Sequence, residues 1–296
     1  MNGRTSRLGR RSYLSLLGST VALGAAGTAS ARSADDTGQQ VSEDPGSSYP
    51  QPIFVDYGAY QTPGNVYDVN DVRGSHTPEF TTDRATQGDR SLRMTFTGGS
   101  KTANVEYRFA DHLGEQLDEV YTRFSFYPEN VALGANDTVR IFWAPLTNGT
   151  GSSGGGAASG TNGWSNAIGF ANRNGSPAPE GYKFFSYRYD MDGSGQFEMT
   201  DAVVEMNAWN EIEAHVSVNG HDGGSASADG VMRYWVNGEL AYENTGLRLT
   251  TSEANRIEGV GPLGYVIGNS SGSLYYDDHV IVPNADRQAA QERLDS

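Results

Sequence analysis

An all-β protein, built as a sandwich of two antiparallel sheets in the manner of a β-jelly roll, is the architecture that this 296-residue sequence favours. Short runs of strand-forming residues recur along the chain and alternate with clusters of Gly, Asn, Asp and Ser, as is typical of such folds. Between Trp209 and Leu240, apolar and polar residues alternate on both sides of a Gly/Ser/Asp-rich loop. No helical periodicity of comparable length competes with this pattern, so strands account for most of the predicted structure.

The segment from Trp209 to Leu240 predicts a pair of antiparallel strands. Ile212, Ala214 and Val216 would face one side of the first strand, and Glu211, Glu213 and His215 the other, which is the period-two pattern of a half-buried strand. Asn237-Gly238 predicts a tight turn into a further strand. The runs predicted as strands are Ser91 to Thr97, Asn104 to Phe109, Val120 to Tyr127, Val139 to Trp143, Asn166 to Phe170, Tyr182 to Tyr189, Trp209 to Val218, Val231 to Val236, Leu263 to Ile267 and Leu274 to Val282.

The first 31 residues have the features of an export signal. Arg10-Arg11-Ser12-Tyr13-Leu14 precedes an apolar run from Leu16 to Ala26, and Ala29-Ser30-Ala31 has the small-residue form of a signal-peptidase site. We therefore expect a twin-arginine signal peptide and a secreted, extracellular protein. A membrane anchor is the alternative, but the apolar run is too short to span a bilayer.

Three further segments follow the signal. Residues 32–50 are polar and acidic and predict a disordered linker. A single β-jelly-roll domain is expected over 51–283, within the usual length of one all-β domain, and a short tail over 284–296. The chain has no cysteine, so its stability must come from a hydrophobic core and not from disulfides.

The composition is strongly acidic. The formal charge is −15, and removal of residues 1–31, which carry four arginines and no acid, brings it to −19. Lysine occurs at only two positions, Lys101 and Lys183. We expect a protein adapted to high salt, and we expect no nucleic-acid partner, because a phosphate-binding face needs clustered basic residues. The sequence makes no prediction of oligomeric state.

The strongest candidate site is the run from Lys183 to Tyr189. In a strand, Lys183, Phe185, Tyr187 and Tyr189 share one face. Tyrosine can act as a base when a cation lies close to it, and Lys183 or a neighbouring arginine would supply that charge. The alternative interpretation is a cross-strand aromatic ladder without chemistry.

The next segment has the spacing of a calcium loop. Asp190, Asp192, Ser194 and Asp201 place oxygen ligands at alternating positions and at position 12, as EF-hand loops do. The flanking helices are missing, and the same residues would equally form a polar hairpin turn. Asp277-Asp278 with Asp56 are a second candidate for a structural calcium ion. No cofactor is expected to be required.

A family resemblance rests on two sets of residues. Trp209-Asn210 to Asn219, the Gly-rich loop, Asp229 to Leu240 and finally Tyr275-Tyr276-Asp277-Asp278 resemble the C-terminal half of alginate- and glucuronan-lyase-like jelly rolls with a concanavalin A-like fold. Gly163-Trp164-Ser165 followed by Tyr187-x-Tyr189 is similar to the lyase pattern in which a W-S-x-R strand precedes a Y-x-Y strand. The resemblance spans residues 118–282 and indicates polysaccharide lyases of the family fourteen or twenty type.

The resemblance implies β-elimination on a uronate-containing, acidic polysaccharide. It implies Tyr187 and Tyr189 as base and acid, with Lys183, Arg140 or Arg123 positioning the uronate, and Trp164 and Ser165 in contact with substrate. Two departures stand out: Ala167 occupies the position of the arginine of the W-S-x-R pattern, and Val139-Arg140-Ile141-Phe142 replaces a Lys-Leu-Pro-Gly strand. Arg140 can replace the charge of that lysine but is a poor base, because a guanidinium stays protonated.

Two other functions stay open at this point. A carbohydrate-binding module without activity would use Tyr187, Tyr189 and Trp235 as stacking platforms, and a structural surface domain would need no site at all. His215, on the polar face with Glu211 and Glu213, is a further candidate for contact with a sugar. Convergence of the two tyrosines with a cation on one face would separate these hypotheses.

Overall fold

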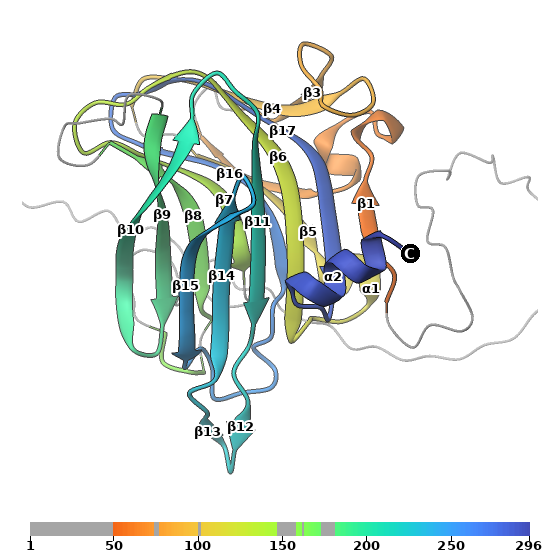
Figure 1. The fold of residues 1–296 in the computed structure, drawn as a ribbon, viewed down its shortest axis with the longest axis vertical. Coiled ribbons are helices and arrows are strands. Elements are labelled where there is room, and N and C mark those ends of the chain that lie inside the picture. The colour runs from red at the N-terminus through yellow and green to blue at the C-terminus, as the bar shows by residue number, and fades with distance from the viewer. Residues whose placement is uncertain (1–49, 74–76, 100–101, 147–157, 162, 173–180) are drawn as a thin grey trace, which may run out of the picture. The chain divides into compact units, whose positions relative to one another are not determined.

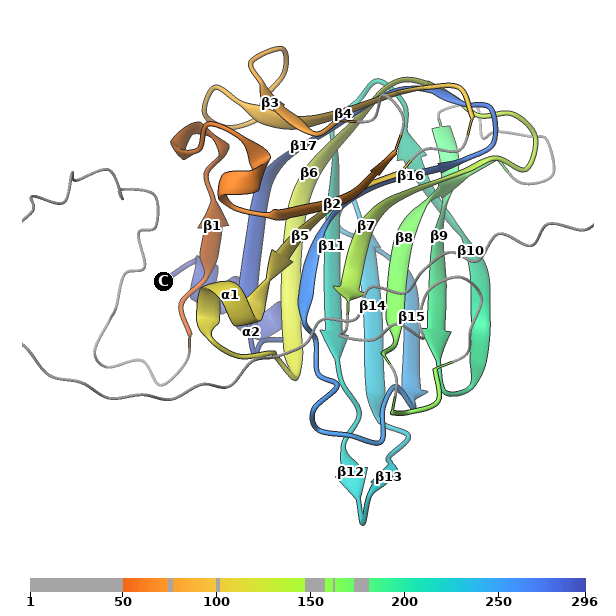
Figure 2. The same ribbon diagram turned by 180° about the vertical axis from the view of Figure 1, so that it is seen from behind.

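Two antiparallel sheets packed face to face form the body of the protein (Figures 1 and 2). The computed structural model describes residues 50–73, 77–99, 102–146, 158–161, 163–172 and 181–296, except the side chains of 144–146 and 194. The predicted signal peptide and residues 32–49 of the predicted linker lie outside this part of the chain. No helix in the described ranges is long and apolar enough to cross a membrane.

The first sheet has eight strands, and seven of them follow one path from edge to edge. In spatial order these are β15 (Glu239–Leu247), β14 (Gly230–Val236), β11 (Asn210–Ser217), β6 (Glu119–Ala132), β17 (Ser271–Pro283), β4 (Ser91–Thr97) and β3 (Glu79–Thr81), and β1 (Ile53–Val55) pairs with part of β17.

The second sheet has seven strands. Their order is β10 (Gly193–Glu205), β9 (Gly181–Asp190), β8 (Ser165–Ala171), β7 (Thr138–Leu146), β16 (Gly259–Ile267), β5 (Thr102–Arg108) and β2 (Asp68–Arg73). A small hairpin of β12 (His221–Asp222) and β13 (Ser225–Ala226) projects from the end of the sandwich (Figure 1).

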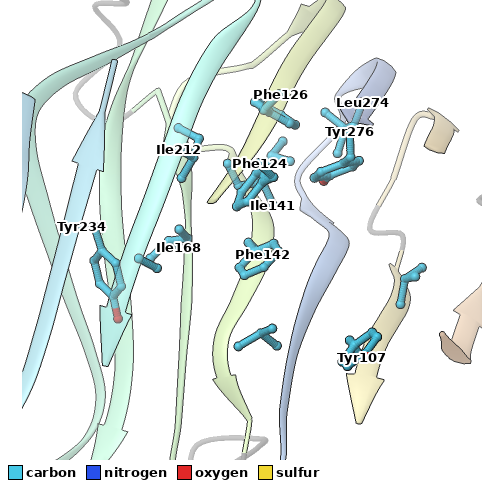
Figure 3. Close-up of a cluster of buried hydrophobic side chains, with 14 of the residues drawn as sticks. Tyr107, Phe124, Phe126, Ile141, Phe142, Ile168, Ile212, Tyr234, Leu274 and Tyr276 are labelled. Atoms are coloured by element: carbon cyan, nitrogen blue, oxygen red, sulfur yellow. The ribbon is translucent and has the colours of Figure 1, made fainter. Parts of the chain in front are cut away.

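The hydrophobic core lies between the two sheets, because alternate residues of each strand point inward. Phe124 on β6 stacks against Phe142 on β7, with ring centroids 4.3 Å apart, and so joins one sheet to the other. Tyr276 packs against both Phe124 and Phe126, and Ile212 and Tyr234 belong to the same core (Figure 3). Full burial of each large apolar side chain contributes on the order of 2 kcal/mol.

Two short helices flank the sheets. The first is α1 (Phe109–Leu113), which directly follows β5. The C-terminal tail forms α2 (Arg287–Leu294), with the Asp286 side chain accepting a hydrogen bond from the Ala289 amide at its start. Helix α2 packs against the outer face of the eight-stranded sheet, where Ala285 and Ala290 contact Tyr121, Val280 and Val282 (Figure 1).

The prediction of an all-β, two-sheet fold is confirmed. Each predicted run falls on a strand, and Ser91 to Thr97 has the bounds of β4. Most of the segment with calcium-loop spacing is the thirteen-residue strand β10, which forms with β9 the hairpin that was the alternative interpretation.

Candidate active site

Strand β9 brings the predicted tyrosines to the outer face of the seven-stranded sheet. Its alternate residues Tyr182 and Phe184 belong to the core, so Phe185, Tyr187 and Tyr189 point away from it. The Tyr187 and Tyr189 hydroxyl oxygens are 2.9 Å apart, and their rings meet edge to face. The two phenols therefore form one hydrogen-bonded unit through which a proton can pass.

The neighbouring strand β8 presents only small side chains on this face. Ser165 lies opposite Tyr189, Ala167 opposite Tyr187 and Gly169 opposite Phe185. Gly169 has no room for a side chain, because a Cβ atom there would lie 2.0 Å from the Val139 carbonyl oxygen. On the β8 side, the two tyrosines are thus bordered by residues with small side chains or none.

The side chain of Arg140 on β7 extends over these small residues toward Tyr187. It pairs with Gly169 in the sheet, and its guanidinium lies 4.2 Å from the centre of the Tyr187 ring and 4.8 Å from that of Tyr265 on β16. Such stacking of a guanidinium on aromatic faces is favourable. The absence of a side chain at Gly169 lets the β7 backbone approach β8 closely at Arg140.

Arg140 has no carboxylate within ion-pair distance among the described residues. Burial lowers the pKa of Arg140 from its ordinary value, and the nearby tyrosines Tyr187, Tyr189 and Tyr265 oppose that effect. A guanidinium stays charged at neutral pH all the same. The site therefore holds a partly desolvated positive charge, which an anionic group of a ligand can neutralise.

Lys183 and Arg123, the other predicted cations, do not reach the tyrosines. Lys183 lies four residues before Tyr187, about 13 Å along the strand, and is paired with Asp201 at 2.7 Å. Arg123 belongs to the other sheet, on its outer face, 3.8 Å from Glu211. The hydrophobic core separates it from Tyr187.

Trp164 and Ser165 differ in where they point. Trp164 is fully buried in the core, and its indole N–H donates to the Asn255 carbonyl at 3.0 Å, so it is not a surface for sugar. Ser165 lies on the outer face beside Tyr189 but is 2 % exposed.

His215 and Trp235 lie on the outer face of the eight-stranded sheet, not beside the tyrosines. His215 is buried, with Nε2 2.9 Å from a Glu119 carboxylate oxygen. Trp235 pairs with Glu213 in the sheet, and Arg287 of α2 stacks over its ring at 4.8 Å. The predicted half-exposed polar face is thus largely covered by a helix that follows much later in the sequence.

The predicted calcium ligands are engaged elsewhere. Asp190 accepts hydrogen bonds from Arg188, the Asp192 amide and Gln196, and Asp192 pairs with Arg248. Asp201 is with Lys183, about 23 Å from Asp190 along β9. The side chain of Ser194 lies outside the described residues. No three His, Asp or Glu side chains of the described ranges are grouped as metal ligands.

The second calcium candidate lines a cavity. Asp56, Asp277 and Asp278 border a space of about 320 Å³ at the β1 end of the sandwich. Asp277 already accepts hydrogen bonds from the amides of Thr86, Gln87 and Asp278, while its burial raises its pKa. Calcium binding stays a prediction at both positions.

Sequence reasoning missed two aromatic residues of this face. Tyr265 was inside a predicted strand, and its pairing with Arg140 depends on a register that the sequence does not give. Trp143 closes the predicted run Val139 to Trp143, and a bulge in β7 places it on the same face as Arg140. The available signal in the sequence was its place three residues after Arg140 in the same predicted strand.

Comparison with known proteins places the fold. No family model and no curated protein matches the sequence. Among solved structures, a variant of alginate lyase Aly36B in complex with alginate tetrasaccharide superposes with a TM-score of 0.57 at 15% identity, covering 79% of this chain and 98% of that one. The marine PL-14 alginate lyase from Aplysia kurodai gives a TM-score of 0.55 at 17% identity over 74% of this chain and 92% of that one.

The chain therefore has the jelly-roll fold of these alginate lyases, and the predicted polysaccharide-lyase-like jelly roll is confirmed as a fold. At this identity the likeness carries the architecture alone. The chemistry must be argued from the arrangement of Arg140, Tyr187 and Tyr189.

Proposed function

We propose that this protein is a polysaccharide lyase that cleaves a uronate-containing polysaccharide by β-elimination. Arg140 carries the proposal, as a partly buried cation without a carboxylate partner in the described chain that stacks on Tyr187. The protein is otherwise strongly acidic. A lone positive charge beside two linked phenols suits a ligand that brings both a carboxylate and a proton to be moved.

In the proposed reaction, the uronate carboxylate pairs with Arg140, and this acidifies the C5–H bond. One phenol of the Tyr187–Tyr189 pair, in its anionic form, takes the C5 proton. The C5–H electron pair becomes the C4=C5 double bond while the C4–O4 bond breaks and its electrons leave with O4. The other phenol protonates O4, and a proton passed across the 2.9 Å hydrogen bond between the hydroxyls resets the pair.

Absorbance of the new C4=C5 double bond tests the reaction on the mature protein, residues 32–296, with uronate polymers in molar salt. Tyr187→Phe should lower kcat about 10²- to 10⁴-fold, the range of one general acid or base. Tyr127→Phe, a buried tyrosine of the opposite sheet, is the matched control. Arg140→Gln should abolish turnover, and Arg123→Gln should not.

A carbohydrate-binding module without activity is the second candidate, and Ala167 favours it. The lyase pattern has arginine there, whereas this chain has a methyl group opposite Tyr187. Retention on a polysaccharide, with no absorbance rise on any uronate polymer, would support binding without cleavage.

We also propose that the chain is exported through the twin-arginine route and works in high salt. Arg10-Arg11 and the surplus of acidic residues support this. Replacement of both arginines by lysine should keep the protein inside the cell, as fractionation of cultures would detect.

A further inference from the structure

The Arg140 guanidinium contacts two tyrosine rings that come from different strands. Its central carbon is 4.2 Å from the centre of the Tyr187 ring and 4.8 Å from that of the Tyr265 ring. Tyr187 belongs to β9 and Tyr265 to β16, and these strands lie on opposite sides of β7 in the strand order. Aromatic contacts therefore hold this cation from both sides of its own strand.

Tyr265 meets Arg140 through the register of β16. The two residues are direct cross-strand partners, and the register of the strand pair shifts between Pro262 and Tyr265. Opposite residues of an antiparallel pair have their side chains on the same face of the sheet, so Tyr265 shares the outer face with Arg140. The Tyr265 side chain is half-buried there. Because both partners belong to paired strands, the contact is part of the sheet itself.

Arg140 differs from most other arginines of the described chain in what holds it. Arg108 and Arg188, for example, each donate to buried or partly buried carboxylates. Within the described ranges, no carboxylate lies at ion-pair distance from Arg140. The groups that the structure places around its guanidinium are tyrosines.

Such an arrangement suits a cation that has to bind an anion. A carboxylate partner would fix the guanidinium but would also neutralise its charge and occupy its N–H donors. The face of an aromatic ring attracts the cation and leaves its net charge and the donors at its edge for a ligand. Because arginine has several rotatable bonds, holding it in place beforehand lowers the entropic cost of binding.

We infer that Tyr265 is a positioning residue, whose ring holds the Arg140 guanidinium against Tyr187 in the orientation that meets a uronate carboxylate. This rests on the proposed function for the identity of the ligand. Tyr265 acts through Arg140 and takes no part in the proton transfers. The role requires the ring and not the hydroxyl, so Tyr265→Phe should preserve it and Tyr265→Leu should remove it.

Hydrogen exchange at Arg140 tests this role without any ligand. NMR of the mature protein would follow the Nε proton of Arg140, assigned by its loss in Arg140→Gln. Tyr265→Leu should speed its exchange about tenfold, as for the loss of one cation–aromatic contact, and Tyr265→Phe should leave it within about twofold. Phe80→Leu, at a half-buried aromatic residue of the other sheet, is the matched control and should change nothing. Unchanged exchange in Tyr265→Leu would overturn the inference.

Binding of a uronate tetrasaccharide shows whether Tyr265 acts through Arg140 or touches the sugar directly. Calorimetry would use the Tyr187→Phe background, which keeps the ring beside Arg140 and slows turnover. There, Tyr265→Leu should weaken binding about tenfold. In a protein that also carries Arg140→Gln, it should add no further loss, because the group that it positions is gone. An equal loss with and without Arg140 would mean direct contact and would overturn the positioning role.

Turnover provides a further readout. Tyr265→Leu should raise KM and lower kcat at least about tenfold, because a misplaced Arg140 binds the carboxylate less well and acidifies the C5–H bond less. Tyr265→Phe should restore both parameters to within about twofold of wild type. Thermal midpoints would show that each variant is folded. Equal kinetic losses in the two variants would contradict a role for the ring alone.

The outcomes separate the two proposals. Faster exchange in Tyr265→Leu and not in Tyr265→Phe, with no absorbance rise on any polymer, would reject the elimination and keep the positioning role. Elimination by wild type with unchanged exchange and kinetics in Tyr265→Leu would reject the positioning role and keep the elimination. If the tetrasaccharide binds to none of the proteins, the uronate site is rejected and the exchange result decides the role of Tyr265.

Discussion

Gly169 and Gly195 lie beside the two groups that the site needs most. Gly169 lets the β7 backbone, which carries Arg140, approach β8 closely. Gly195, at the start of β10, has a left-handed backbone with φ of +61°, and a Cβ atom there would lie 2.6 Å from the Tyr187 hydroxyl oxygen. Both glycines thus matter to the site because a larger residue at either position would displace the atoms next to it.

Gly195→Ala should therefore damage activity more than stability. The added methyl group displaces the end of the Tyr187 side chain, and we expect kcat to fall at least about tenfold for a misplaced group. The left-handed backbone adds a destabilisation of about 1 kcal/mol. Gly88→Ala is the control, because Gly88 also has φ of +61° but nothing within 4 Å of its Cβ position. Equal activity of the two variants would contradict the prediction.

His279 gives the fold a defined pH dependence. Its ring lies between the sheets, with Nδ1 2.8 Å from the Tyr67 hydroxyl and Nε2 3.1 Å from the Thr122 hydroxyl. Burial lowers the pKa of His279 to about 3, whereas an unfolded histidine titrates near pKa ~6.5. Its contribution to stability is complete above about pH 6.5 and is lost as the pH falls toward about 3, because only the unfolded chain takes up the proton.

Urea unfolding of wild type and His279→Gln between these pH values would measure this effect. The wild type should lose up to about 1.4 kcal/mol per pH unit more steeply than the variant. Glu106 and Asp277, whose raised pKa values change stability with pH in the opposite direction, are present in both proteins, so their effect cancels in the comparison. Parallel slopes would show that His279 does not stay neutral in the fold.

At the scale of an element, one arginine links α2 to a buried carboxylate of the sheet. Arg287 donates to both oxygens of Glu213 at 2.7 Å, and Glu213 is 2 % exposed. Arg287→Ala should destabilise the protein by about 1–3 kcal/mol, because a buried carboxylate loses its charged partner and keeps only the hydrogen bond from the Tyr121 hydroxyl. Activity should not change, since α2 lies on the sheet opposite the tyrosines.

Chemical denaturation measures this loss, with Arg256→Ala as the matched control. Arg256 pairs with Asp118 at 3.0 Å on the surface, where such pairs contribute about 0–1 kcal/mol. A loss of stability no larger than that of the control would mean that the Glu213 contact is not what holds α2.

The strands themselves were largely predictable, for a physical reason that also explains the failures. Alternation identifies a strand with one buried face, as in β4, β9 and β14. It failed for β10, where Gly193 and Gly195 resemble a loop although the chain is a strand. It also placed His215 in solvent, because nothing local shows that other elements cover that face.

The site was predictable only in part. Tyr187 and Tyr189 follow from their spacing on one strand, and Arg140 was one of three candidate cations. Choosing among the three requires the cross-strand register, including the β7 bulge after Arg140. Lys183 satisfied the same local pattern but is paired with Asp201. Trp164 looked equally suitable, and only the tertiary packing puts it in the core.

At the scale of the whole molecule, the main feature is the excess of negative charge. The mature chain would carry 17 basic and 36 acidic residues. Their mutual repulsion opposes the compact state, and salt shortens its range to a few ångströms near molar concentration.

We therefore expect the thermal midpoint of the mature protein to rise steadily from low to molar sodium chloride. Calorimetry would follow it, with an equal osmolality of sucrose as the control for effects other than screening. A midpoint that does not respond to salt, or responds equally to sucrose, would mean that repulsion is not what limits stability.

The path of Arg140 over Gly169 also has an evolutionary consequence. The lyase pattern that the sequence resembles has arginine at the position of Ala167, whereas this chain has an arginine at position 140 on the adjacent strand. In space, the two positions lie on neighbouring strands, so a guanidinium that starts from either can serve the same tyrosine. We expect homologues to fall into two groups, one with arginine at 167 and one with arginine at 140 and glycine at 169. Ancestral reconstruction would then show the exchange as one event.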